Sequence, residues 1–207
     1  MRPRPKEDEM TKIVLGMSVS LDGIAGPEAP DADGMEVFAA VLGWVFPLRS
    51  WRAQQGQEGG EDSVDSKVWQ DNFDRFGPQV IGRRMFDFGY PNWGENPPFH
   101  APVFVLTHRG QDRIDKSDTS YTFVTGGIAE AVGQARAVAD GKDVLLAGGV
   151  SLAQQALDAG LADEVVLHVV PRLVGRGMRL FGAARADLRC TDAIQGEGAV
   201  HLSYQVR

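Results

Sequence analysis

Residues 144–157, VLLAGGVSLAQQAL, constrain the fold most, because an apolar run passes through two glycines into an amphipathic pattern. The run predicts a buried strand at 144–147, and the pattern after it predicts a helix. Ser151 and Gln154 have the S-x-x-Q spacing of a capping box for this helix, which we expect to run to Asp158, where an Ala-Gly stop follows. The segment is therefore a strand-to-helix junction built around glycine.

The two glycines of this junction, Gly148 and Gly149, suggest an anion site. A helix start offers free backbone N–H groups and the positive end of a dipole, and glycine allows a phosphate to approach that backbone closely. A tight turn without a ligand is the alternative, and the Gly-Gly pair alone does not decide between the two.

Strand-like and helix-like patterns alternate along the rest of the chain. Helical patterns lie at 63–76, with Val64, Val68, Phe73 and Phe76 along one side, and at 128–139. This alternation predicts an α/β fold with a mostly parallel central sheet, helices on both faces, and ligands beyond the carboxyl ends of the strands. The expected strands are 12–20, 79–81, 103–106, 121–124, 144–147, 164–170 and 199–206.

The chain has 207 residues, which is enough for one sizeable core. We expect a flexible N-terminal arm at 1–11 and a single domain at 12–207. The domain contains an insertion or lid at about 27–75, where proline, acidic and Gly-Gly segments surround an apolar piece that carries tryptophan. This piece should be part helical and broken near Pro47.

Composition excludes several classes of partner. The net charge of −7 argues against nucleic acid and against an anionic membrane surface, because both need a basic field. A single cysteine, Cys190, allows no internal disulfide and no cysteine-rich zinc site, so no metal is expected. The charged start lacks the apolar stretch of a secretory signal, and the longest apolar segment, 37–48, is too short to span a bilayer. A cytoplasmic protein is expected.

Two further junctions carry cationic residues. VIGRRMF, at 80–86, places two arginines in the first turn of a helix, where the helix dipole disfavours them unless an anion compensates. FVLTHR, at 104–109, ends a strand with a hydroxyl, an imidazole and a guanidinium. Any one arginine alone is more simply explained as solvated charge. Three such strand ends together favour a ligand with several phosphates, although neither a P-loop nor a G-x-G-x-x-G junction occurs.

Five motifs in order, SVSLDGIAG, VIGRRMF, PVFVLTHR, LLAGGVSL and VVLHVVPRLVGRG, resemble the dihydrofolate-reductase-like superfamily. Within it the chain is most similar to the reductase domain of the bifunctional riboflavin-biosynthesis deaminase-reductase and its stand-alone relatives. The similarity covers about residues 12–206. It implies a three-layer dihydrofolate-reductase-like fold and an NADPH-dependent oxidoreductase that transfers hydride to a C=N or C=O bond of a small heterocyclic substrate, as 5-amino-6-(5-phosphoribosylamino)uracil reductase does.

The resemblance also implies where the cofactor lies. The Gly-Gly turn and its helix would hold the pyrophosphate of NADPH, and the other two junctions would surround the adenosine phosphates. The arginines favour NADPH over NADH, because the extra phosphate needs cationic partners. A segment after the first strand resembles the one that lies over the nicotinamide. The implied cofactor residues are Ile24, Ala25, Gly82, Arg83, Arg84, Thr107, His108, Arg109, Gly148, Gly149, Val150, Ser151 and Leu152.

Two residues are candidates for the catalytic centre. Asp22, in SLDG, matches the aspartate that the riboflavin-pathway reductases place at the substrate, where it would orient the substrate or supply a proton; a turn-forming side chain is the alternative. His168, in the apolar strand VVLHVV, faces the same pocket in one interpretation and is a hydrogen-bonded core histidine in the other.

The sequence also allows other functions. Folate reduction is disfavoured because 37–57 contains no Asp or Glu to bind a pterin, unless Glu36 or the loop before it supplies one. A nucleotide-binding protein without turnover and an acidic interaction module are further alternatives. Relatives commonly form dimers, so a homodimer is expected, and the apolar strand 165–170 is a candidate contact.

Overall fold

The computed structural model describes residues 11–182 and 185–207. The arm predicted at 1–11 lies, except for Thr11, outside these described residues. Within them, no helix is both long enough and apolar enough to cross a membrane.

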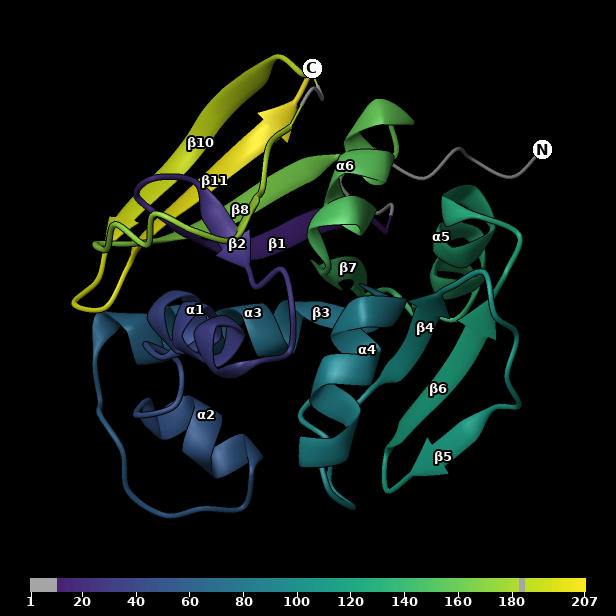
Figure 1. Cartoon of the computed structure of the whole chain (residues 1–207), viewed down its shortest axis with the longest axis horizontal. Helices are drawn as coiled ribbons and strands as arrows, with labels where there is room; N and C mark the ends of the chain where they lie inside the picture. The colour runs from purple at the N-terminus through teal and green to yellow at the C-terminus, as the bar shows by residue number, and fades with distance from the viewer. Residues whose placement is uncertain (1–10, 183–184) are drawn as a thin grey trace.

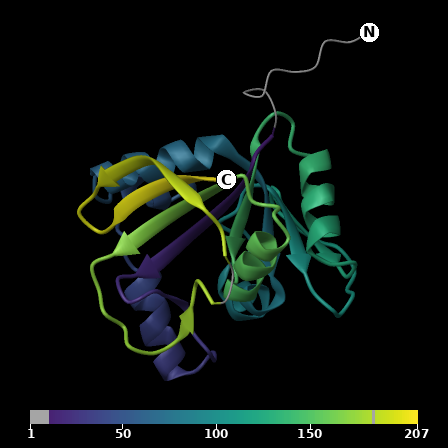
Figure 2. The ribbon, with the colours of Figure 1, turned by 90° about the horizontal axis from the view of Figure 1, so that it is seen from above.

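A nine-stranded sheet forms the centre of the structure, in the order β10-β11-β8-β1-β7-β3-β4-β6-β5. The six strands from β8 to β6 are mutually parallel, and β11, β10 and β5 pair antiparallel at the two ends. The β10–β11 hairpin projects at the end far from β5 and β6 (Figures 1 and 2). The strands are β1 (Ile13–Ser20), β3 (Phe76–Gly82), β4 (Pro102–Leu106), β5 (Ile114–Lys116), β6 (Thr119–Val124), β7 (Asp143–Gly148), β8 (Glu164–Val170), β10 (Leu188–Gln195) and β11 (Val200–Val206).

Helices cover both faces of this sheet, as predicted. α5 and α6 pack on one face, where Leu15 and Leu146 belong to the largest apolar cluster. The first four helices lie on the other face, and a second sheet of two short strands, β2 (Ile24–Gly26) and β9 (Met178–Arg179), borders it. The helices are α1 (Ala32–Leu42), α2 (Arg49–Gln54), α3 (Val64–Arg75), α4 (Arg83–Gly89), α5 (Ile128–Ala137) and α6 (Val150–Asp158), with a 3-10 turn, η2 (Tyr90–Asn92), after α4.

The predicted α/β class and the seven predicted strands are confirmed, but four strands were missed. β2, β5 and β9 are only two or three residues long, and β10 is exposed along nearly all of its length, so none of them has a buried apolar run to reveal it. β8 lies between β11 and β1 and is mostly buried, so the strand proposed for a dimer contact has no free edge.

The region predicted as an insertion is part helical, and its helices α1 and α2 are separated at 43–48, next to Pro47, as expected. The apolar side predicted for the next helix, α3, is wrong at its start. Val64 is 46% exposed, whereas Asp65 and Ser66 face the interior. The buried side of α3 carries polar groups because they have hydrogen-bond partners beneath it.

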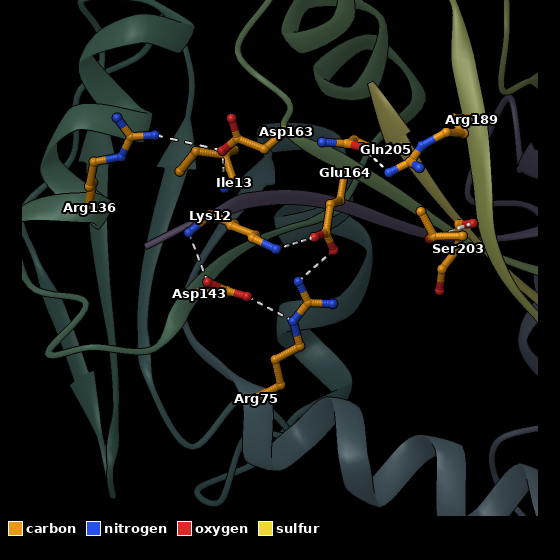
Figure 3. Close-up of polar contacts among 11 residues, drawn as sticks. Lys12, Ile13, Arg75, Arg136, Asp143, Asp163, Glu164, Arg189, Ser203 and Gln205 are labelled. Atoms are coloured by element: carbon orange, nitrogen blue, oxygen red, sulfur yellow. Dashed lines mark hydrogen bonds and ion pairs between the residues drawn. The ribbon is translucent and has the colours of Figure 1, made fainter. Parts of the chain in front are cut away.

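An ion-pair network joins the beginnings of three strands to the end of α3 (Figure 3). Arg75 donates to Asp143 (2.8 Å) and to Glu164 (2.6 Å), and Lys12 donates to Glu164 from its side chain (2.7 Å) and to Asp143 from its backbone (2.8 Å). Burial alone would raise the pKa of Glu164, but the hydrogen bonds from Lys12 and Arg75 outweigh it and lower the pKa. The network therefore favours the ionised form of Glu164 and ties α3 to the sheet.

Replacing Arg75 with Met should lower the free energy of unfolding by about 1–3 kcal/mol, because two partly buried carboxylates lose a partner. Urea unfolding of the purified variant measures this loss. Arg49→Met is the matched control, since Arg49 and its partner Asp62 are both more than half exposed and their pair should contribute no more than about 1 kcal/mol. Equal losses in the two variants would contradict this role for Arg75.

Candidate active site

Two glycine junctions meet where β3 and β7 end side by side. Ile81 pairs with Gly148, and a Cβ added to Gly149 would lie 3.4 Å from the Cα of Gly82. Gly148 and Gly149 have φ values of +156° and +98°, and a Cβ on Gly148 would lie 2.4 Å from the sulfur of Met85. Residues other than glycine rarely adopt these φ values, so a side chain at either position would strain the backbone. The sequence-predicted junctions are therefore brought together at one edge of the sheet.

The helix after this junction begins at Val150, with Gly149 as its N-cap and no side chain capping it. The predicted capping box is wrong. Ser151 lies inside the first turn and its hydroxyl accepts from Gln155, while Gln154 donates to the carbonyl of Leu180 (3.1 Å) and so ties α6 to the segment after β9. The first backbone N–H groups of α6 consequently have no side-chain acceptor from a cap.

Two of the predicted arginines lie close to these glycines and share one carboxylate. Arg83 follows Gly82 directly, and its Nε donates to Asp87 (2.7 Å). Arg109, beyond β4, donates to the other oxygen of Asp87 (3.3 Å). Asp87 was missed by the sequence analysis, although it follows Arg83 by four residues, a spacing that places both on one side of a helix. The chain itself thus supplies part of the compensating negative charge.

The other residues of these two junctions have different surroundings. Arg84 donates to the carbonyl of Glu28, between β2 and α1, and contacts the sulfur of Met178 (3.5 Å). Thr107 is buried, and its hydroxyl accepts from the backbone N–H of Arg109 (3.0 Å), which shapes the end of β4, whereas His108 is exposed.

Four of the predicted nicotinamide and pyrophosphate residues have buried or partly buried side chains. Ile24 packs with Val37 and Val41 of α1, and Ala25 packs against the largest apolar cluster. Val150 and Leu152 are buried as well. Any ligand contact from these four residues would therefore come mainly from the backbone. Their cofactor role stays a prediction.

Asp22 holds a loop of its own chain. Its carboxylate accepts from the Ser20 hydroxyl (2.6 Å) and from the backbone N–H groups of Val174 (3.0 Å) and Gly175 (2.7 Å). These bonds, the one from Ser20 first, lower the pKa of Asp22 to about 2. The carboxyl is ionised at neutral pH, so it has no proton to give there.

The loop that Asp22 holds forms one wall of an open cleft of about 310 Å³, which we call the α1 cleft. The opposite wall is α1, and Arg176 of the loop forms ion pairs with Asp33 and Glu36 across it. The α1 cleft is lined by Glu36, Val37, Ala40, Arg172, Leu173, Val174 and Arg176.

His168 is a buried, hydrogen-bonded histidine, as the second interpretation of the sequence expected, and it belongs to a chain whose other members the sequence did not reveal. Its Nδ1 lies 2.8 Å from Nδ1 of His201, which is opposite it on β11, and Nε2 of His201 lies 2.7 Å from Asp65 of α3. Asp65 also accepts from the backbone N–H groups of Glu197 and Gly198. Trp44 covers both imidazoles, at ring distances of 5.1 and 5.3 Å.

The protonation of this chain follows from its geometry. A carboxylate only accepts, so Nε2 of His201 donates to Asp65. Burial lowers the pKa of His201, although the hydrogen bond to Asp65 raises it, and burial followed by the His201 charge lowers the pKa of His168 to about 3. With both rings neutral, Nδ1 of His201 accepts and Nδ1 of His168 donates. Nε2 of His168 then carries a lone pair.

Known proteins resemble the chain in sequence and fold. The uncharacterized protein YyaP of Bacillus subtilis (strain 168) is 30% identical over 113 residues, which are 49% of this chain and 57% of that protein. The match thus spans little more than half the length of this relative. The sequence identity is lower for the solved structures.

A protein of Shewanella sp. PV-4 attributed to riboflavin biosynthesis has a TM-score of 0.68 at 21% identity and covers 95% of this chain and 99% of its own. Dihydrofolate reductase of Enterococcus faecalis, complexed with NADP(H), has a TM-score of 0.56 at 11% identity, and the match covers 95% of this chain and 96% of that one. A diaminohydroxyphosphoribosylaminopyrimidine deaminase/5-amino-6-(5-phosphoribosylamino)uracil reductase of Thermotoga maritima has a TM-score of 0.57 at 13% identity. The match covers 97% of this chain and 58% of that one. These likenesses show a dihydrofolate-reductase-like fold.

Replacing Asp65 with Ala should lower the free energy of unfolding by about 3 kcal/mol or more, because the His201 ring and two backbone N–H groups lose their acceptor in the interior. Denaturant unfolding measures the loss. Asp71→Ala, at an exposed position of the same helix, should change stability by less than about 0.5 kcal/mol. An Asp65→Ala variant as stable as the wild type would show that the buried hydrogen-bonded chain contributes little to folding.

The low pKa of His168 predicts acid sensitivity. The unfolded chain takes up a proton below about pH 6.5, whereas the folded chain resists it down to about pH 3, so stability falls as the pH drops through this window. The slope between pH 7 and 5, above the range of ordinary carboxylates, should approach 1.4 kcal/mol per unit for one histidine. A His168→Asn variant should have a smaller slope, and an unchanged slope would contradict the assignment.

The comparison of whole families agrees with the individual likenesses. The sequence model described as the RibD C-terminal domain matches residues 11–200, which includes every strand from β1 to β10 and the start of β11. The motifs that carried the resemblance in sequence all lie within this match. The chain belongs to the RibD C-terminal domain family.

Proposed function

We propose that this protein is an NADPH-dependent reductase that transfers hydride to a C=N or C=O bond of a small heterocyclic substrate. One observation carries the proposal: Gly82, Gly149, Arg83 and Arg109 converge at one edge of the sheet, although they come from three separate junctions. Family membership and the folds of two reductases, one of them complexed with NADP(H), support it.

The residues present fit a dinucleotide. The glycine pair leaves the backbone open where α6 begins, and its N–H groups have no capping side chain, so a pyrophosphate would find donors there. Arg83 and Arg109 would hold the adenosine end. NADPH would supply the hydride, and the protein would orient it against the substrate.

The substrate is proposed to lie in the α1 cleft. In this cleft Arg176 and Glu36 pair with each other, and Arg172 adds a positive charge, so the cleft would accept a polar heterocycle that carries an anionic group. Asp22 holds the loop that forms one wall, and its ionised state makes it a positioning group and not the proton donor. His168, beneath Trp44, would support the neighbouring part of the sheet.

Folate reduction is the second candidate, because Glu36 of α1 lines the cleft and supplies a carboxylate that a pterin could use. This carboxylate is paired with Arg176, so it is already engaged, and we rank this activity lower. A binding protein without turnover would share the nucleotide site and differ only in the reaction.

Replacing Gly149 with Ala should weaken NADPH binding about tenfold or more, because φ of +98° strains a side chain and the new methyl group points at Gly82. Titration of NADPH fluorescence measures the affinity, and circular dichroism checks the fold. Gly94→Ala is the matched control, since Gly94 also has a positive φ (+62°) but no neighbouring atom within 4 Å of the added Cβ, and it should bind NADPH like the wild type.

Mixing the wild-type protein with NADPH separates the candidate functions. An enzyme should quench or shift the cofactor fluorescence and then oxidise NADPH when an imine-bearing heterocycle is added, and dihydrofolate as substrate tests the second candidate. A binding protein stops at the fluorescence change. No effect of NADPH at all would overturn the proposed function.

A further inference from the structure

Asp87 has an unusual position for an acidic residue, because it lies at the proposed phosphate site. It is an acidic residue of α4, and its two oxygens contact two arginines from different elements, Arg83 at 2.7 Å and Arg109 at 3.3 Å. The three side chains together carry a charge of +1. A carboxylate thus lies between the two cations that the proposed function assigns to phosphate binding.

The two arginines are held very differently. The guanidinium of Arg83 lies over the rings of Phe86 and Phe123, at 5.6 Å from each, and its side chain is 23% exposed. Arg109 is 72% exposed, and its contact with Asp87 is a weak surface ion pair that a ligand can rearrange. Of the three guanidinium nitrogens of Arg83, only Nε donates a hydrogen bond to a residue in the described part of the chain. Its two terminal nitrogens can therefore face a ligand while Asp87 stays in place.

We propose that Asp87 determines how far this protein discriminates between NADPH and NADH; this rests on the proposed function. The two cofactors differ at one ribose position, where NADPH has a 2′-phosphate and NADH a 2′-hydroxyl. Arginines bind the phosphate in a two-pronged geometry, whereas a carboxylate accepts a hydrogen bond from the hydroxyl. Arg83 and Arg109 would bind the 2′-phosphate of NADPH, and Asp87 would accept from the 2′-hydroxyl of NADH. The same site therefore accommodates both cofactors.

The negative charge of Asp87 opposes the gain in NADPH affinity that the two arginines provide. A 2′-phosphate within reach of both guanidinium groups lies only a few ångströms from the carboxylate, and this repulsion costs roughly a tenfold loss in affinity at a half-exposed site. The wild-type protein should therefore bind NADPH less than about tenfold more tightly than NADH. Removing the charge should strengthen the phosphate contact and remove a good acceptor for the hydroxyl.

The test compares dissociation constants of NADPH and NADH for the wild type and for Asp87→Asn, by fluorescence titration without substrate at one fixed ionic strength. The ratio of the NADH constant to the NADPH constant should rise about tenfold or more in Asp87→Asn, with tighter NADPH and weaker NADH binding. Arg109→Gln should lower the ratio by weakening NADPH alone. Thermal melting confirms that each variant is folded.

Asp71→Asn is the matched control, because Asp71 forms an i,i+4 ion pair with Lys67 on the exposed side of α3, and it should leave both constants unchanged. A ratio that is unchanged in Asp87→Asn, or equal weakening of both cofactors, would overturn the inference while leaving the reductase intact. Binding of neither cofactor to the wild type would instead overturn the proposed function itself.

Discussion

The backbone contact between Gly82 and Gly149 is the constraint on which the candidate site depends. It exists because β3 and β7 are parallel neighbours that end at the same level, so two chain segments far apart in sequence turn into helices at one place. A side chain at Gly149 would contact Gly82 directly and would require a strained backbone. The position of Arg83 follows from the same contact, since it is the residue after Gly82.

The sequence was sufficient for the features that arise locally. Strands such as β1 and β8 are recognisable as mostly apolar runs because both of their faces are buried. The glycine junctions are recognisable because residues other than glycine rarely adopt the φ that Gly149 requires. The convergence of the junctions was predictable as well, because parallel strands place their carboxyl ends at one edge. Even the Arg83–Asp87 pair had a local signal in its four-residue spacing.

The features that depend on distant contacts were not predictable. The polar chain from Asp65 through His201 to His168 joins α3, β11 and β8, and only the sheet order places these residues together. The same contacts explain why α3 buries Asp65 and leaves Val64 exposed, against its apolar pattern. The capping box failed because α6 begins at Val150, before Ser151, and Gln154 donates instead to the Leu180 carbonyl, in a segment that the local pattern does not include.

Asp22 accepts hydrogen bonds from the backbone N–H groups of Val174 and Gly175, and this has a consequence for how the α1 cleft varies among related proteins. The anchor holds main-chain amides, which every residue except proline possesses, so side chains in this segment can be exchanged while the wall keeps its path. Exchanges at Arg172, Leu173 or Arg176 would then alter the charge and shape of the α1 cleft, while the wall and the glycine junction keep their positions.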